Sequence, residues 1–492
     1  MKHASQLSRD TIAVAIAAGV AGIAGNLALV GLSPTELVVG QIDAAVVEAT
    51  PDALVTFSIE TLGSSGHALH VALSIGIAVV ALGSMAMLGQ SLGRAAKSPT
   101  TSVVATFGLV TAVALLVTGT PLAALATGAG AGVAVALRVV LRVVRDDPAG
   151  VSLDRRRAIE YAASVGVLAA VGSAAGVLRT KQDFEAVGGE VSQTMLDDAA
   201  AASFDVAGLQ GLVSTRREHF EVDIGAINPS RDDVTHAISV TGAVEDEQEF
   251  SMQDLRELPT ENRYNTLRCV GDDLNGRKID TAVWTGTPTN AVLAEIDQHS
   301  DCECVMLRAP DGYEVEFPLE ALRGGLLAYG MNGVEVPKGH GFPVRALVPG
   351  HWGETNVKWL TEIEFLEKPA DGYWERRGWQ GTGPVETVAK IHAVEKRGDG
   401  RVVVAGPAYA GTRGIERVEV TTDGGGTWQD AQLTEPLPGE DVWRHWKADL
   451  DLEEQTTVTA RATDGTGTLQ SSDESGSYPS GASGWVSKEV KP

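Results

Sequence analysis

The side chains best suited to bind a compact anion lie between residues 331 and 360, in the stretch MNGVEVPKGHGFPVRALVPGHWGETNVKWL. His340, Arg345 and Lys358 stand there among glycines and prolines that fix turns, so their side chains can converge without long flexible approaches. An arginine fork and an ammonium group are common partners of a phosphate. The stretch therefore predicts a loop-rich wall that binds a phosphate-bearing ligand.

Three cysteines offer thiol chemistry. Cys269 lies in NTLRCVGDDLNGRKIDTAVWTG, where its thiolate could serve as a soft metal ligand, although an isolated cysteine is more often a small buried residue. Cys302 and Cys304 alternate along a predicted strand with no third or fourth ligand nearby. We interpret this pair as two small core residues rather than a C-x-C metal site.

The order MNG, HGFPVR, VPG and VKWL resembles the pterin-binding core of the sulfite oxidase family of molybdenum enzymes, over about residues 220–490. The resemblance implies a molybdenum–molybdopterin cofactor with a single pterin and no nucleotide. It also implies that the Cys269 thiolate binds the molybdenum. The Trp-Thr-Gly sequence at 284–286 matches the tryptophan, small residue and glycine that follow this cysteine in the family.

The resemblance also assigns the cofactor contacts. Asp311, in APDGYEVEFPL, stands where the family has an aspartate that contacts the pterin, and Arg345 is expected to bind the terminal phosphate. Backbone groups of the Asn-Val-Lys triplet before the tryptophan would complete the cradle. The residues expected to bind the cofactor are Asp311, His340, Arg345, Asn356, Val357 and Lys358.

The substrate side departs from the family, in which arginines line a pocket for the sulfite anion. Asp223 occupies the position of one such arginine, Asp273 and Leu274 replace an arginine pair, and Trp379 replaces a tyrosine beside the metal. Carboxylates repel an anion, and an indole cannot exchange a proton as a phenol does. We therefore expect a neutral or cationic substrate, with Cys269, Trp379 and Asp223 at the catalytic centre. Sulfite would need positive charge from Arg277, Arg376, Arg377 or Arg444.

Ahead of these motifs the chain is apolar. Five uncharged runs, at residues 11–32, 67–93, 100–118, 121–137 and 161–178, are close to the roughly 20 residues that cross a bilayer. Basic residues lie before the first run, between the second and third, and between the fourth and fifth. The loop 33–66 has five acidic residues and no Lys or Arg. By the positive-inside rule the amino terminus is inside and everything after residue 178 is outside. The sequence predicts a multi-pass protein of the cell membrane with an extracytoplasmic catalytic domain.

Two features of these runs have competing interpretations. The arginines at 155–157 resemble an internal twin-arginine export signal, but Glu160 falls where that signal prefers an apolar residue, so we favour a plain membrane anchor. His67 and His70 share one helix face and could serve a haem or a quinone. Because no other run has a histidine, interface histidines without a cofactor are the preferred interpretation.

Charge and cysteine content exclude several functions. The first 178 residues have ten basic and ten acidic side chains, so the net charge of −25 belongs to the remainder. An acidic surface of this kind argues against nucleic-acid binding. Three cysteines and no C-x-x-C-H motif argue against an iron–sulfur cluster or a c-type haem. Electrons would pass to an external electron-transfer protein or a quinone.

The expected architecture is multidomain. An α-helical transmembrane bundle at 1–178 and a linker at 179–215 precede an α+β molybdopterin domain of the sulfite oxidase type at 216–382. Alternating strands at 387–491 predict an immunoglobulin-like β-sandwich. Within it, DGGGTW and WRHWKADL resemble the family's dimerisation domain, which implies a homodimer.

The resulting expectation is an extracytoplasmic, membrane-anchored molybdenum oxidoreductase that performs two-electron oxygen-atom transfer on a small sulfur or related oxo substrate. One alternative is reduction of an S-oxide or N-oxide, as in the family's periplasmic methionine sulfoxide reductase branch. Another is a non-catalytic membrane scaffold with a degenerate cofactor fold. The joint presence of Cys269, His340, Arg345 and Lys358 argues against the scaffold.

Overall fold

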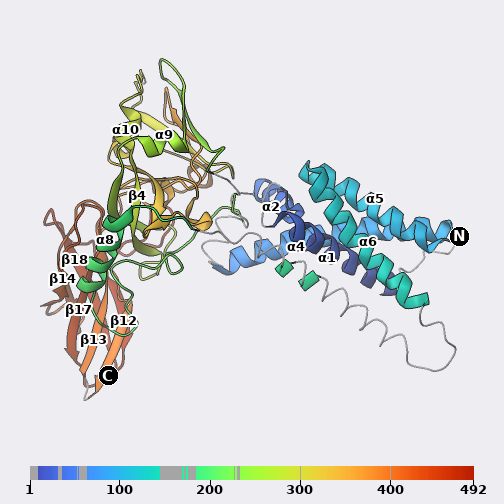
Figure 1. The fold of residues 1–492 in the computed structure, drawn as a ribbon. Coiled ribbons are helices and arrows are strands. Elements are labelled where there is room, and N and C mark those ends of the chain that lie inside the picture. The colour runs from blue at the N-terminus through green and yellow to red at the C-terminus, as the bar shows by residue number, and fades with distance from the viewer. Residues whose placement is uncertain are drawn as a thin grey trace. The chain divides into compact units, whose positions relative to one another are not determined.

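The computed structural model describes residues 9–31, 36–51, 54, 64–143, 169–170, 173–174, 184–225, 228–229, 233–299, 301–398 and 401–492. Contacts within the chain define two compact units (Figure 1). The first unit consists of Met1–Leu54, Thr61–Asp183 and Asp223–Ser230. The second unit consists of Val55–Glu60, Phe184–Val222 and Arg231–Pro492.

The first unit is helical, and apolar sequence explains why. Its longer helices are α1 (Arg9–Val30), α2 (Val38–Ala49), α4 (Ser64–Ala95), α5 (Pro99–Thr118) and α6 (Pro121–Val143). In the described residues, four helices are long and apolar enough to cross a membrane, namely Thr11–Val30, Leu69–Ala95, Pro99–Thr118 and Pro121–Val140. They coincide with the first four predicted runs. The predicted orientation across a membrane stays a prediction.

Other membrane predictions fall on residues that the structure does not describe. The fifth run, 161–178, lies outside the described residues except for four helical positions, and so do the arginines at 155–157 and the side chain of His67. His70 is described, and its Nε2 lies 3.5 Å from Asp43 Oδ1 of α2. No haem or quinone is needed to explain the position of this imidazole.

Glycines let helices of the first unit pack backbone against backbone. A Cβ added at Gly19 of α1 would lie 2.6 Å from Val79 O, and one at Gly83 of α4 would lie 2.8 Å from Ala15 O. Both distances are too short for a side chain. Small residues at such crossings are typical of apolar helices, which associate by close packing.

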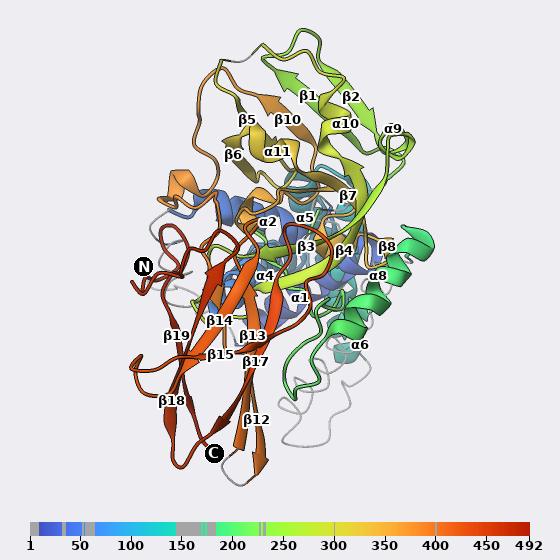
Figure 2. The same ribbon diagram turned by 90° about the vertical axis from the view of Figure 1, so that its left-hand side faces the viewer.

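Two sheets form the first half of the second unit (Figure 2). One is antiparallel, and its strand β4 is buried at every residue except the last. In order, it contains β3 (Glu261–Arg268), β4 (Ile279–Pro288), β7 (Leu326–Met331) and β8 (Val334–Glu335), with β9 (Arg345–Leu347) on β7. The other is mixed and contains β2 (Gln248–Ser251), β1 (Ala237–Gly242), β10 (Glu362–Phe365), β5 (Cys304–Arg308) and β6 (Glu314–Pro318).

Short helices connect these strands. The α-helices are α9 (Met252–Glu257), α10 (Thr289–Leu293) and α11 (Leu319–Arg323), and the 3-10 turns are η2 (Lys338–His340), η3 (Gly353–Thr355) and η4 (Glu375–Arg377). One apolar cluster joins both sheets, with Ile238, Leu307, Leu327 and Ala346 among its buried members. The turns η2 and η3 lie in the glycine- and proline-rich stretch that the sequence analysis singled out.

The second half of the second unit is β-rich, as predicted, and consists of two antiparallel sheets. One contains β11 (Val388–Ala389), β13 (Arg401–Tyr409), β17 (Arg444–Asp451) and β16 (Gln432–Leu433), with β12 (Ala393–Gly398) on β13. The other contains β15 (Gln429–Asp430), β14 (Ile415–Thr421), β18 (Thr456–Asp464) and β19 (Val486–Val490). A single buried cluster draws residues from both, including Val404, Val418, Trp446 and Val458. The immunoglobulin type of this arrangement stays a prediction.

The segment 179–215 differs from the predicted linker. From Phe184 onward it belongs to the second unit and contains α8 (Gly189–Ala202). Ser192 Oγ on this helix donates a hydrogen bond to Asn262 Oδ1 of β3 at 2.8 Å. Met195, Leu196, Ala199 and Ala202 lie on one face of α8 and pack in an apolar cluster that includes Val283 of β4, a helical spacing that the linker prediction overlooked.

The two neighbouring cysteines also differ from their predicted role. Cys302 and Cys304 form a disulfide at the start of β5, rather than two reduced core residues. Among the described residues, no group of three or more histidine, cysteine or acidic side chains could hold a metal ion. The C-x-C metal alternative therefore has no support in the structure.

Candidate active site

Cys269 stands where the central antiparallel sheet gives way to a loop. Strand β3 ends one residue earlier, and the chain returns at β4. Cys269 N donates to Lys278 O at 3.0 Å, and Asp272 N donates to Cys269 O at 3.3 Å, so the loop is closed on itself. The thiol is half-buried and is the free cysteine of the described residues.

The thiol is protonated in this environment. Burial raises the pKa of Cys269 to about 11, with Lys278 opposing the rise and Asp272 adding to it. Metal binding to sulfur displaces this proton, because only the thiolate is a strong ligand. Cys269 is therefore a neutral thiol that would become a thiolate when it binds a metal.

A buried ion pair clamps the loop from the C-terminal half of the unit. Lys390 Nζ donates to Asp272 Oδ2 at 2.6 Å and to Gly276 O at 2.9 Å. The Lys390 side chain is fully buried. Burial and then the charge of Arg268 lower the pKa of Lys390 to about 8, while Asp272 opposes this shift.

Arg268, directly before the cysteine, is a second buried cation. It donates to Glu386 O at 2.8 Å and to Ala482 O at 2.9 Å, and its guanidinium lies 4.6 Å from the Trp352 ring centroid. Both carbonyls belong to segments more than one hundred residues away in sequence. Long-range contacts therefore hold the backbone on each side of Cys269.

The three predicted phosphate-binding side chains are brought together by close backbone packing. Gly341 has φ of +113°, and a Cβ there would lie 3.0 Å from Arg345 Cβ and 3.1 Å from Lys358 Cα. Arg345 donates to His340 O at 3.0 Å and to Asn356 O at 2.8 Å, and Lys358 donates to Gly339 O at 2.9 Å. The positive φ and the tight approach both require glycine at 341.

His219 joins these residues and was not predicted. Its ring centroid lies 5.1 Å from that of His340 and 5.8 Å from that of Trp284, over which the Arg345 guanidinium lies at 5.2 Å. Nothing in the pattern RREHF distinguishes this histidine from a surface one. We call His219, His340, Arg345 and Lys358 the cationic cluster.

Both histidines of the cationic cluster have lowered pKa values. Burial, with the charges of Arg345 and Lys358, lowers the pKa of His340 to about 4, although the hydrogen bond between the His340 ring and the Arg216 carbonyl opposes the shift. Burial, followed by the charges of His340 and Arg345, holds the pKa of His219 well below its usual value. Excess positive charge of this kind favours an anionic ligand.

The other predicted cofactor residues have distinct environments. Asn356 is buried, with its Oδ1 accepting from Val348 N at 2.8 Å, so its side chain holds its own loop. Val357 is buried in the core shared by the two sheets, and its carbonyl accepts from Ala346 N at 2.9 Å. Asp311 lies in the β5–β6 turn and accepts from Tyr313 N at 3.1 Å. Their predicted contacts with a pterin stay predictions.

Trp379 lies beside the cysteine loop. A Cβ added at Gly271 would lie 3.6 Å from the Trp379 ring and 3.9 Å from Cys269 Sγ, so this glycine separates the two. Trp379 is 3 % exposed, and its Nε1 is buried with no hydrogen-bond partner among the described residues. Asp223 instead clusters with the first unit, in Asp223–Ser230, and its predicted role at the catalytic centre stays a prediction.

Two buried glutamates near this loop were also missed. Glu354 lies in η3, directly after Gly353, whose added Cβ would lie 3.5 Å from Cys269 Cα. Burial and then the charge of Glu375 hold the pKa of Glu354 well above its usual value. The position of Glu354 between the matched VPG and VKWL motifs was a usable signal; Glu375 and the distant Lys390 had none.

The four arginines named as sources of charge for sulfite are engaged. Arg277 donates to a backbone carbonyl at 2.7 Å. Arg444 donates to two backbone carbonyls, at 3.0 and 3.1 Å. Arg376 forms an ion pair of 2.8 Å with a glutamate of β6. Arg377 lies 3.7 Å from the centroid of a tyrosine ring. These contacts do not favour a binding site for a small dianion.

Two family models match this part of the chain. Residues 225–374 match the oxidoreductase molybdopterin binding domain, and residues 384–477 match the Mo-co oxidoreductase dimerisation domain. The first match includes Cys269 and every predicted cofactor residue. Trp379 and Asp223 lie outside both matches.

Several known proteins are similar to part of this chain. Mitochondrial sulfite oxidase of Mus musculus is 30 % identical over 291 residues, which cover 48 % of this chain and 53 % of that protein. Sulfite oxidase of Arabidopsis thaliana is 26 % identical over 301 residues, 48 % of this chain and 76 % of that protein. The solved sulfane dehydrogenase SoxCD from Paracoccus pantotrophus is 22 % identical, with a TM-score of 0.47, and the match covers 53 % of this chain and 75 % of that one. The chain spans about half the length of the mammalian relative. The two family models and these curated relatives identify residues 225–477 as a molybdopterin-dependent oxidoreductase region of the sulfite oxidase family.

Proposed function

We propose that the protein is a membrane-anchored, extracytoplasmic molybdenum oxidoreductase that exchanges an oxygen atom with a small sulfur or related oxo substrate. One observation carries the proposal: a single domain contains a free thiol at the end of β3 and a cluster in which the cationic side chains of Arg345 and Lys358 lie beside His340, whose Nε2 is 3.5 Å from Glu221 Oε1. A thiol and a cationic rim are what a metal-binding pterin with a terminal phosphate requires.

The residues present fit this cofactor. Cys269 would bind the metal, Arg345 and Lys358 would neutralise the phosphate, and neutral His340 would contribute one ring nitrogen. A cavity of about 650 Å³ borders this cluster, with Arg216, whose carbonyl lies 3.0 Å from His340 Nε2, in its wall. When bound, the molybdenum–pterin group supplies two-electron oxygen-atom transfer.

The chain's own residues would orient the reaction and shape its pocket. The clamped loop from Cys269 to Lys278 holds the thiol in place, and Trp379 closes one side of it. Proton exchange by Trp379 is excluded by its chemistry. With the candidate arginines engaged elsewhere, the pocket favours a neutral or cationic substrate over sulfite.

The surroundings support the remaining parts of the proposal. Four apolar helices supply a multi-pass anchor in the cell membrane. The Cys302–Cys304 disulfide is typical of compartments outside the cytoplasm. The match to a dimerisation domain supports a homodimer, and an external electron-transfer protein or quinone would exchange single electrons with the metal.

The test is metal analysis combined with a substrate screen on the purified full-length protein. We expect near-stoichiometric molybdenum after expression in a cofactor-competent host, and turnover of an S-oxide or N-oxide with an artificial electron carrier at about 1 to 1000 per second. Protein without molybdenum from such a host would reject the enzyme and favour the scaffold. Turnover of sulfite at a comparable rate would instead reject the pocket argument and leave the enzyme assignment intact.

A further inference from the structure

Beside the cysteine loop, the second unit buries carboxylate oxygens that have no hydrogen-bond donor. Both carboxylate oxygens of Glu354 are buried without a partner among the described residues. The buried carboxylate of Glu375 has only backbone N–H groups, of Glu375 and Gly372, to stabilise it. Burying an ionised carboxylate without a partner costs several kcal/mol, so such a group either stays protonated or is completed by a cation. The indole N–H of Trp379 is a third buried polar group in this condition.

Aromatic rings extend from these carboxylates to the cysteine loop. Tyr313 Oη donates to Glu354 O at 2.8 Å, and its ring lies 5.8 Å from that of Tyr373. Tyr373 lies 5.0 Å from Trp374, and Trp374 lies 6.1 Å from Trp379. We call Tyr313, Glu354, Trp374, Glu375 and Trp379 the acidic-aromatic cluster.

The charges of both carboxylates and of the thiol act on Tyr313. Burial, followed by the charges of Glu354, Glu375, Asp311 and Cys269, holds the pKa of Tyr313 well above its usual value. The mutual repulsion of Glu354 and Glu375 raises the pKa of Glu354 in addition to its burial. A cation placed between them would relieve both effects.

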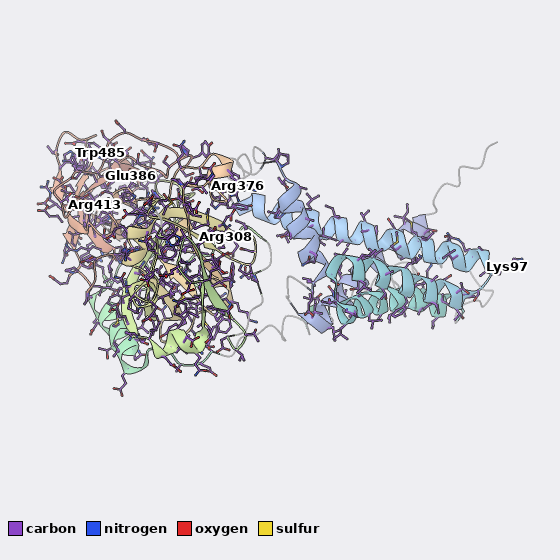
Figure 3. The ribbon with its side chains drawn as sticks, turned by 90° about the horizontal axis from the view of Figure 1, so that it is seen from above. Lys97, Arg308, Arg376, Glu386, Arg413 and Trp485 are labelled. Carbon is purple, nitrogen blue, oxygen red and sulfur yellow. A yellow bond between two sulfur atoms is a disulfide. The ribbon has the colours of Figure 1, made fainter. Side chains whose placement is uncertain are left out.

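The charge of Arg376 lowers the pKa of Glu375, but the Glu354 carboxylate has no hydrogen-bonded cation among the described residues. Arg308 and Arg376, both labelled in Figure 3, pair with Glu314, and Arg376 is 42 % exposed. Arg377 donates to Tyr373 O at 2.8 Å and lies over the Tyr373 ring. That stacking shows that the aromatic faces here accept a cation, while the Glu354 oxygens remain without a donor.

We infer that the acidic-aromatic cluster recognises a positively charged nitrogen of the substrate, with Glu354 and Glu375 as the specificity-determining residues. The inference rests on the proposed function, because Cys269 marks the reacting centre. It narrows the substrate to small organic cations in which a quaternary or protonated nitrogen lies a few bonds from the oxo group. Carboxylates beside aromatic faces are the usual means of recognising such nitrogens.

The test compares two molecules of the same shape and different charge. The cation is 2-(methylsulfinyl)ethyl-trimethylammonium, and the neutral isostere is 3,3-dimethylbutyl methyl sulfoxide. Binding to the full-length, molybdenum-loaded protein is measured by titration calorimetry without an electron donor, so that no turnover occurs. We expect the cation to bind about tenfold more tightly than the isostere, a ratio equivalent to one desolvated cation–π or carboxylate contact.

Variants separate charge recognition from folding. E354Q and E375Q should each lower the cation-to-isostere ratio by about fivefold or more, with little effect on binding of the isostere. E320Q, at a glutamate of α11 with an 88 % exposed side chain, is the matched control and should keep the ratio. A general loss of structure would weaken both ligands together and leave the ratio unchanged, which would count against the inference.

The outcomes distinguish this inference from the proposed function. Equal affinities for the two ligands in molybdenum-loaded protein overturn the cation site and leave the oxidoreductase standing. A cation preference in protein that fails to acquire molybdenum supports the site and rejects the oxidoreductase. Displacement of the organic cation by equimolar Na⁺ or Mg²⁺ would show that the carboxylates hold an inorganic ion, and would overturn the inference.

Discussion

The cationic cluster and the acidic-aromatic cluster belong to the same unit but differ in charge and in how their polar groups are hydrogen-bonded. In the cationic cluster, Arg345 and Lys358 donate to backbone carbonyls, so the cluster is held in shape before any ligand arrives. In the acidic-aromatic cluster, the oxygens of Glu354 and the N–H of Trp379 lack partners among the described residues. A permanently bound cofactor suits a preorganised rim, and a substrate that comes and goes suits groups left open to it.

The comparison also shows how opposite charges can coexist within one domain. Positive groups gather on η2, β9 and the residues after η3, whereas the acids lie on η3 and η4. Cys269 is electrostatically coupled to Glu354 and to Lys278, and is therefore exposed to both signs.

The largest expected effect is at the thiol. C269S should lower kcat by about 1000-fold, because loss of the metal ligand removes stabilisation from the transition state. The double variant C302S/C304S makes the same chemical change at the disulfide and should keep kcat within about threefold. Steady-state kinetics on protein of measured molybdenum content provides the test. Full activity in C269S would show that Cys269 is not the metal ligand.

Removal of the guanidinium tests the preorganised cluster. R345M should weaken cofactor retention by about 10- to 100-fold, since a charge-assisted hydrogen bond contributes about 1.5 to 3 kcal/mol. The measurement is fluorescence of the oxidised pterin released per polypeptide after denaturation. R323M removes an arginine whose side chain is 43 % exposed and should retain the pterin. Unchanged pterin content in R345M would mean that the cluster has another ligand.

The ion pair between Lys390 and Asp272, which holds the cysteine loop, should contribute to the free energy of unfolding. K390M leaves Asp272 as an uncompensated buried charge and should lower the free energy of unfolding by about 3 to 5 kcal/mol. The double variant K390M/D272L removes both charges and should recover most of that loss. Denaturant unfolding in detergent gives both numbers. Equal destabilisation by the single and double variants would show that the ion pair is not the source.

The smallest expected effect tests whether every buried group without a partner marks a ligand. Both ring nitrogens of His445 are buried without a partner among the described residues, yet burial and then the charge of His392 lower its pKa to about 3, so it is neutral. The unfolded chain binds more protons than the folded one between about pH 3 and 6.5, so stability falls as pH falls through that window.

For this histidine the loss between pH 7 and pH 5 should be about 2 kcal/mol, measured as a drop in melting temperature. H445Q should show a shallower pH dependence, whereas H299Q, at an exposed histidine, should match the wild type. Identical slopes in H445Q and the wild type would mean that His445 binds a proton or a ligand in the folded protein.

Much of the fold and part of the site could be predicted from sequence. Apolar runs close to the length that crosses a bilayer predicted the four described long helices, and the HGFPVR and VKWL motifs placed His340, Arg345 and Lys358 together. The contacts of residues 184–215 were not predicted, although Met195, Leu196, Ala199 and Ala202 share one face of α8 and were a usable signal; the hydrogen bond between Ser192 and Asn262 left no such trace. Lys390 was equally hidden, since its partner Asp272 lies 118 residues away.

The sequence by itself indicated the family, the thiol proposed to bind the metal and the cationic residues, because a cofactor held by glycine-constrained loops requires particular residues in a particular order. Only the tertiary structure decided what surrounds the thiol. Whether Glu354 is solvated or buried, and whether an arginine reaches the pocket or bonds to a carbonyl, depends on packing between segments far apart in the chain. Burial sets the free energy of a charge, and burial is a property of the folded chain rather than of any residue within it.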